Sequence, residues 1–140
     1  MDIVFIAGFS LIVDGNSTRD LLKSAFGIPL KGMEADAEYV FADSMEGAKH
    51  FGVWPLHQAA EACFGKSEWP KNLPVPQATI EFEVKDADAV AAAEKELRAK
   101  GHELLHGART EPWGQTVCRL LTKEGVIIGV SFAPWFHEKH

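Results

Sequence analysis

Cysteine is scarce in this sequence. Cys63 and Cys118 are the only two, and they form no C-x-x-C pair. Zinc sites and dithiol redox sites need closely spaced cysteines, so neither kind of site is predicted. A framework of several disulfides is excluded, although one disulfide between these two distant cysteines stays open. Cysteine usage of this kind fits a reducing compartment, and we predict a cytoplasmic protein.

A basic segment is also absent. The chain has 14 Lys and Arg residues against 20 Asp and Glu residues, a formal net charge of -6, and the basic residues are scattered. Nucleic-acid binding requires basic side chains that neutralise phosphates, and anionic membranes attract the same groups. We therefore predict neither a nucleic acid nor a membrane as a partner.

The apolar start of the chain is short. Residues 3–13 resemble the apolar part of a signal peptide, but Asp2 stands where a basic region belongs, and no small-residue cleavage pattern follows. Crossing a bilayer takes about 20 apolar residues. A buried strand is the better interpretation of this segment.

A pattern of strands and helices occurs twice along the chain. In the first half, a strand ends at Asp14-Gly15, and a helix follows that Ser17 can cap and Gly27 can end. In the second half, the helix starts at Asp86 or Asp88. The expected strands are 5–13, 38–43, 49–54, 78–84, 103–106, 116–121 and 126–132, and the expected helices are 18–26, 56–64 and 88–100.

The two halves also share their turns. Glu46-Gly47 and Glu124-Gly125 each join two expected strands. Repeated units usually bury their open faces against each other. We therefore predict one compact domain in which a first module at 1–65 and a second module at 77–140 are joined by a proline-rich linker at 66–76.

Four segments carry a resemblance to a known superfamily. They are FEVKDADAV at 82–90, EPWGQ at 111–115, KEGVI at 123–127 and GVWPL at 52–56. In this order they resemble the strand-to-helix entry, the loop before the penultimate strand, the last turn (without its proline) and the end of the first module in the vicinal oxygen chelate superfamily. That superfamily includes glyoxalases, bleomycin-resistance proteins and extradiol dioxygenases. The resemblance implies an α+β fold of two βαβββ modules, whose curved mixed sheets surround a U-shaped cleft.

The metal-ligand positions of that superfamily hold residues unsuited to a metal. In its enzymes, His and Glu side chains in the cleft bind a divalent ion that acts as a Lewis acid. The matching positions here are Ala7, Thr79, Gly129 and either Phe51 or Gly52. Of these, only Thr79 offers a donor, a weak neutral oxygen, whereas divalent ions prefer imidazole or carboxylate. No metal and no other cofactor is therefore expected.

Other side chains must then carry the function of the cleft. Among the six histidines, only His50 is expected to face it, and the others (His57, His102, His106, His137 and His140) are expected to be structural or on the surface. Planar ligands can stack on aromatic rings, and amide or guanidinium groups can orient them. The candidate ligand-binding residues are Trp54, Trp113, Phe41, Phe51, Phe132, Gln115 and Arg119. Core packing is the alternative role for the aromatic residues, and a surface ion pair is the alternative for Arg119.

Two functions compete at this stage. The first is a homodimeric protein that sequesters an aromatic or apolar drug or metabolite without a metal, as in the bacterial antibiotic-resistance branch of the superfamily. The second is an enzyme, either a lyase, isomerase or dioxygenase with unusual metal ligands, or a metal-free isomerase that uses His50 or Glu81 as its base. A regulatory module without chemistry is a third possibility.

Overall fold

In the computed structural model, which describes residues 1–137, seven strands form one sheet in the order β2-β3-β1-β4-β7-β6-β5. His140 lies outside the described residues. The strands are β1 (Phe5–Val13), β2 (Val40–Ala42), β3 (Phe51–Pro55), β4 (Ala78–Glu83), β5 (His106–Thr110), β6 (Thr116–Leu121) and β7 (Val126–Phe132). The helices are α1 (Ser17–Ser24), α2 (Leu56–Phe64), α3 (Ala87–Ala99) and the short 3-10 helix η1 (Pro134–Phe136).

The sheet has an internal repeat, and this confirms the predicted fold class. β1 and β4 pair antiparallel at its centre, and each is flanked on its other side by a parallel strand, β3 or β7. The first module has its three expected strands but lacks the fourth strand that the βαβββ pattern implies. A single bridge between Lys31 and Phe41 stands where the second module has β5. Pro29, just before the bridge, has no N–H to donate to a ladder, which disfavours a longer strand there.

Most predicted bounds agree with the structure, because glycines and periodic apolar residues mark them. The Asp86 side chain accepts a hydrogen bond of 2.8 Å from the backbone N–H of Ala89, so α3 begins directly after Asp86. Ser17 is not a cap, since α1 starts at Ser17 itself. The strand predicted at 103–106 is also misplaced. Leu104 and Leu105 pack into two different apolar clusters, and β5 begins only at His106.

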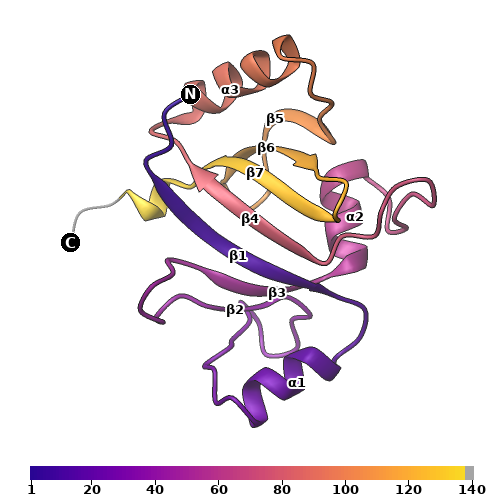
Figure 1. Cartoon of the computed structure of the whole chain (residues 1–140). Helices are drawn as coiled ribbons and strands as arrows, with labels where there is room; N and C mark the ends of the chain where they lie inside the picture. The colour runs from indigo at the N-terminus through magenta and orange to yellow at the C-terminus, as the bar shows by residue number, and fades with distance from the viewer. Residues whose placement is uncertain (138–140) are drawn as a thin grey trace.

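The two faces of the sheet differ in what covers them. Side chains of neighbouring strand residues point to opposite faces. We call the face under α1 and α3 the outer face; its apolar clusters include Val53 beneath α1 and Val84 and Cys118 beneath α3. The opposite face, which carries Ser10, Glu81 and Arg119, is the inner face. In Figure 1, α1 and α3 lie at opposite ends of the sheet, with β1 and β4 between them.

Both ends of the inner face are covered. Helix α2 and the linker close one end, where Cys63 and Trp69 pack on Ile127. The segment with η1 covers the other end and is held to β4 by a hydrogen bond of 2.8 Å between His137 and Glu83. Figure 1 shows α2 and η1 on opposite sides of the strands. Both cysteines are buried free thiols.

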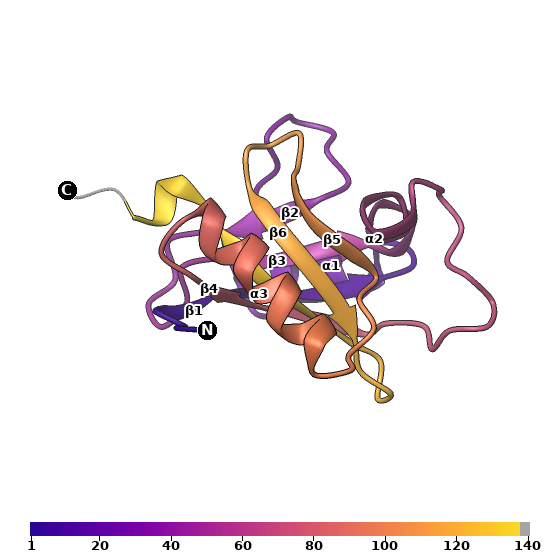
Figure 2. The same ribbon diagram turned by 90° about the horizontal axis from the view of Figure 1, so that it is seen from above.

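The sheet curls strongly from one edge to the other. Four inter-strand steps separate β3 from β6, which would span about 19 Å in a flat sheet. The guanidinium carbon of Arg119 on β6 nevertheless lies 5.4 Å from the ring centre of Trp54 on β3. Because side chains stand roughly perpendicular to a strand, this contact requires the two modules to turn toward each other. Figure 2 shows β5 and β6 running steeply across the view while β1 lies nearly horizontal.

None of the helices in residues 1–137 combines the length and the apolar character that crossing a membrane requires.

Candidate functional site

Glu81 lies at the centre of the inner face and is held by an amide. The Nε2 of Gln115 donates to Glu81 Oε2 at 2.6 Å and to the hydroxyl of Ser131 at 2.8 Å. The indole N–H of Trp113 donates to the Oε1 of Gln115 at 2.9 Å. Gln115 is buried, and these bonds use its donor and acceptor groups together. Glu81, Gln115 and Trp113 therefore form one ordered unit.

A wall of aromatic rings faces this unit from the first module. The ring centres of Phe41 and His50 are 5.1 Å apart, and those of Tyr39 and Phe41 are 5.9 Å apart, with nearly parallel planes. Tyr39 Oη and His50 Nε2 form a short hydrogen bond. The wall stands on two paired strands, because Phe41 lies within β2, Tyr39 directly precedes β2, and His50 directly precedes β3.

The protonation of this wall follows from its burial. Burial raises the pKa of Tyr39, and the nearby charge of Glu81 raises it further, while a hydrogen bond with Ser10 opposes both. Burial lowers the pKa of His50, although Glu81 and Asp43 act in the opposite direction. A neutral His50 can accept the Tyr39 proton in their hydrogen bond. Glu81 thus acts electrostatically on both members of the pair.

The C-terminal segment adds aromatic surface at the rim. The ring centre of Phe136 lies 6.5 Å from that of His50 and 5.7 Å from that of Trp135. A side-chain carbon built on Gly114 would lie 3.8 Å from the ring of Trp135, which places Trp135 next to the Trp113 loop. Trp113 and Trp135 are 50% and 42% exposed. Both indoles therefore offer ring surface to a ligand.

The structure also places the positions that the sequence analysis matched to metal ligands of the superfamily. A side-chain carbon added at Gly52 would lie 2.5 Å from Tyr39 Oη and 2.8 Å from Ser10 Oγ. At Gly129 it would lie 3.3 Å from Glu81 Cγ. Ala7 and Thr79 are buried, and residues 1–137 contain no cluster of three or more His, Cys, Asp or Glu side chains suited to a metal. The residues present at these positions do not fit a divalent ion.

Arg119 is buried, so the surface ion pair considered for it is wrong. It is 4% exposed, and its Nη1 donates to Glu111 Oε1 at 3.1 Å and to His106 Nε2 at 3.0 Å. Burial lowers the pKa of His106 to about 4, and the charges of Arg119 and Arg109 act in the same direction. His106 is therefore a neutral acceptor near pH 7.

Two of the predicted aromatic residues lie on the other face. Phe51 packs against the cluster beneath α1, and Phe132 packs against the cluster beneath α3. The expectation that they line the cleft is corrected by strand alternation: Phe41 pairs with Gly52, so Gly52 and Trp54, not Phe51, share the inner face. For Trp54, Trp113, Phe41, Gln115 and Arg119, a role in binding stays a prediction.

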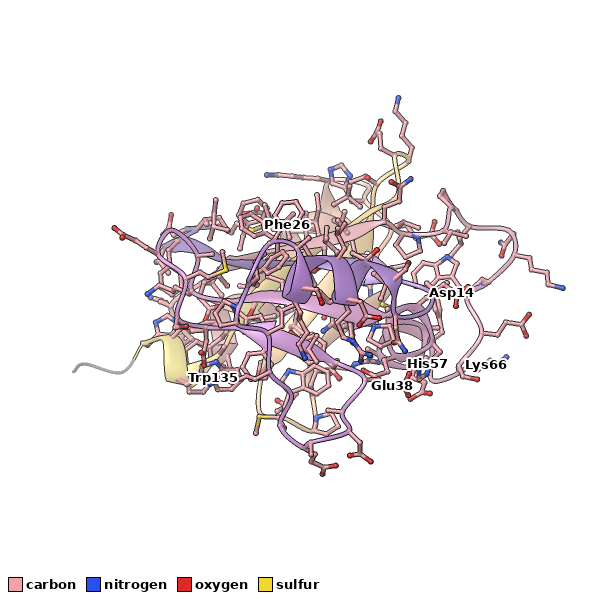
Figure 3. The ribbon with its side chains drawn as sticks, turned by 90° about the horizontal axis from the view of Figure 1, so that it is seen from below. Asp14, Phe26, Glu38, His57, Lys66 and Trp135 are labelled. Carbon is pink, nitrogen blue, oxygen red and sulfur yellow. The ribbon has the colours of Figure 1, made fainter. Side chains whose placement is uncertain are left out.

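The remaining histidines lie apart from Glu81. His57 pairs with Glu38 at 2.8 Å near the start of α2, at the opposite end of the molecule from Trp135 (Figure 3). His102 is exposed after α3. Sequence reasoning missed Tyr39, Trp135 and Phe136 as site residues. Tyr39 alternates with Phe41 in a predicted strand, and this signal could have found it; nothing marks the residues that follow β7.

Comparisons with known proteins identify the fold. No family model and no curated protein sequence matches the chain. Among solved structures, it is similar to Streptomyces coelicolor methylmalonyl-CoA epimerase, with a TM-score of 0.60 and 16% identity over 99% of this chain and 100% of the other. It is also similar to a glyoxalase/bleomycin resistance protein/dioxygenase superfamily member from Vibrio splendidus, with a TM-score of 0.52 and 14% identity over 88% of this chain and 94% of the other.

A third structure, described as NAD-dependent benzaldehyde dehydrogenase from Legionella pneumophila, gives a TM-score of 0.56 at 10% identity over 89% of this chain and 96% of the other. Proteins with such different names share this architecture, so the structural similarity is evidence for the fold and not for a function. Together with the repeated modules and the curled sheet, it shows that the chain has the fold of the vicinal oxygen chelate superfamily.

Proposed function

We propose that this protein binds a planar or apolar small molecule on the inner face of its sheet without the help of a metal. The observation that carries the proposal is the replacement at Gly52. The space that a ligating side chain would need there is filled by the hydroxyl groups of Tyr39 and Ser10. Tyr39 in turn belongs to a stacked aromatic wall that faces the carboxylate of Glu81. Aromatic walls with a few fixed polar groups are typical of small-molecule sites.

Trp113 should be an anchor for such a ligand. A library of aromatic compounds is screened against the protein by saturation-transfer NMR, and each hit is titrated by tryptophan fluorescence. Trp113→Ala should weaken binding by about 1 kcal/mol or more, because the variant loses ring surface and leaves Gln115 without its indole donor. The control is Phe26→Ala, which removes an exposed ring from the outer side near α1.

Equal affinities for Trp113→Ala and the parent would contradict this placement of the site. A library without any hit would count against the proposed function itself. Trp69→Ala is unsuitable as a control, because Trp69 is buried and its indole N–H donates to the carbonyl of Pro74 at 2.9 Å.

Metal-free proton transfer is the second candidate function. It is favoured by the meeting of a half-buried carboxylate, Glu81, with the hydrogen-bonded pair of Tyr39 and His50. Glu81 would take a proton from a carbon of the ligand, since a positioned carboxylate is a common general base. The hits from the screen are incubated with the protein in D2O. Exchange of a carbon-bound hydrogen that Glu81→Gln abolishes, while binding persists, would favour the enzyme over simple sequestration.

We further propose that the protein is a homodimer that pairs through the outer face. The alternate positions of β1, β4 and β7 that face outward carry no charged side chain, and Ile6 and Phe9 among them are exposed. Next to them lies an apolar cavity of about 310 Å³ that Phe82 and Ile128 help to line. A ridge and a hollow on one largely apolar face can fit a second copy across a two-fold axis. Soluble monomers rarely leave such a patch uncovered.

Sedimentation velocity at micromolar concentration tests the homodimer. The parent should sediment as twice the 15.4 kDa chain, and Phe9→Glu should sediment as a monomer, because a charge at the interface would have to be desolvated. The control is Met33→Glu, which changes an exposed loop residue outside this face and should leave the dimer intact. A parent that is monomeric under these conditions would overturn the proposal.

We also propose a cytoplasmic location, because the two buried free thiols of this protein suit the reducing conditions there.

A further inference from the structure

The cluster around the buried Arg119 joins two guanidinium groups to one carboxylate. Arg119 and Arg109 both bond to the same carboxylate oxygen, Glu111 Oε1, at 3.1 Å and 3.0 Å. The third neighbour, His106, is a neutral acceptor near pH 7, as described above. Two guanidinium groups therefore share one carboxylate, and of the two only Arg119 is buried, since Arg109 is exposed to water. A further anion beside the buried guanidinium of Arg119 would be stabilised by its charge.

One edge of the Arg119 guanidinium is unused. Within residues 1–137, its hydrogen bonds all leave from Nη1, so Nε and Nη2 have no partner there. Among the side-chain nitrogen and oxygen atoms of these residues, only Glu83 Oε1 is both fully buried and without a hydrogen-bond partner. The unpaired Nε and Nη2 of Arg119 are therefore not fully buried. Nε and Nη2 form the fork that binds a carboxylate or phosphate with two parallel hydrogen bonds.

The position of this fork connects it to the site around Glu81. Glu81 pairs with Gly129, and Gly129 pairs with Arg119, so all three lie in one row across the inner face. Two inter-strand steps place the backbones of Glu81 and Arg119 about 10 Å apart. Beneath the guanidinium, the indole of Trp54 fixes its plane through a contact of 5.4 Å. One small molecule can thus reach both the aromatic wall and the fork.

We infer that Arg119 binds an oxyanion of the ligand, a carboxylate or a phosphate, through its unused Nε and Nη2 edge. This inference rests on the proposed function and narrows its ligand class to planar or apolar molecules with one anionic group. Glu111 and Trp54 act as positioning residues, since they hold the guanidinium and leave its fork open.

Three phenyl compounds test the inference: benzoate, the isosteric but uncharged benzamide, and phenyl phosphate. Each is titrated into the full chain while amide resonances are followed by NMR. Benzoate or phenyl phosphate should bind at least tenfold more tightly than benzamide and should shift the Arg119 and Trp54 signals. The stronger of the two anions identifies the oxyanion as carboxylate or phosphate. Arg119→Lys keeps the charge but loses the fork, and should lose most of that tenfold preference.

The control is Arg98→Gln, which removes a positive charge from an exposed ion pair on α3 and should leave the preference unchanged. If the parent binds benzamide as tightly as both anions, the inference is overturned while the proposed function stands. If no probe binds, the inference fails, and the library screen described above decides the proposed function separately. If Arg119→Lys does not fold, the inference is still tested in the parent. The test is then the ratio of anion to benzamide affinity, together with whether the shifted resonances belong to Arg119 and Trp54.

Discussion

Replacing Gly8 by alanine should lower the free energy of unfolding by about 3 kcal/mol or more, and the melting temperature by about 10 °C. The added carbon would lie 2.1 Å from the carbonyl oxygen of His50 and 2.9 Å from its carbonyl carbon. Both are backbone atoms, so no rotation of a flexible side chain can relieve the contact. The strands β1 and β3 must separate, although the backbone N–H of Phe9 donates to that same carbonyl at 3.2 Å.

Gly47→Ala is the matched control for Gly8→Ala. Gly47 has a φ of +97°, and an added carbon there would meet no atom within 4 Å, so only backbone strain opposes the substitution. We expect a loss of about 1 kcal/mol. Urea unfolding followed by tryptophan fluorescence measures both variants. If Gly8→Ala costs no more than Gly47→Ala, the two strands separate easily at this point, and His50 is held less firmly than the structure indicates.

The fold could be predicted from the sequence because its signals are local and repeated. The bounds of β6, β7 and α2 agree with the prediction, since turn glycines and proline flank apolar runs with a clear period. β5 was misplaced for the opposite reason. Its segment contains His106, Gly107 and Arg109, which carry little strand propensity, and it is held by its pairing with β6.

The site was harder to predict, because it depends on which face each strand residue points to. A slip of one residue moves a side chain to the other face of the sheet, and this explains why Phe51 was assigned to the inner face instead of Gly52. The contact between Trp54 and Arg119 depends on the curl of the whole sheet across four inter-strand steps. No local pattern encodes that distance, so the burial of Arg119 could not be foreseen.

The glycine at position 52 and the aromatic wall are physically connected. Gly52 allows Tyr39 and Ser10 to approach the strand, and any side chain at that position would displace them. The glycine at the position matched to a ligand and the approach of a phenol therefore occur at the same point. The proposal of binding without a metal rests on this point, where neutral hydrogen-bonding groups fill the available space.

Replacing Glu83 by glutamine should stabilise the protein at pH 7.5, by about 1 kcal/mol or more. Glu83 is 0% exposed, and its Oε1 is the enclosed oxygen that lacks a partner within residues 1–137. Its Oε2 accepts from the backbone N–H of Ala133 at 2.6 Å and lies 2.8 Å from His137 Nε2. Burial raises the pKa of Glu83, although these two contacts and a hydrogen bond with Ser131 act in the opposite direction. Glutamine keeps the shape and the acceptor for Ala133 but carries no charge.

The stability difference between Glu83→Gln and the parent should depend on pH in a defined direction. A carboxyl group whose pKa is raised on folding contributes stability that is fully present below its unfolded value, near pH 4.5, and that is lost as the pH rises through the folded value. The advantage of Glu83→Gln over the parent should therefore be small at pH 4.5 and should grow toward pH 7.5. Urea unfolding at a series of pH values measures the difference directly, and subtraction of the parent cancels the titration of all other groups.

Glu94→Gln should show the opposite trend and serves as the control. Hydrogen bonds from the backbone N–H of Ala108 and from Arg98 lower the pKa of Glu94, so its stabilising effect is present above its unfolded value and is lost as the pH falls. Its glutamine variant should therefore fall below the parent as the pH rises. If Glu83→Gln follows the same trend as Glu94→Gln, then Ala133 and His137 stabilise the charge of Glu83 by more than burial opposes it. In that case the C-terminal segment is held by an ion pair, and not by a neutral hydrogen bond.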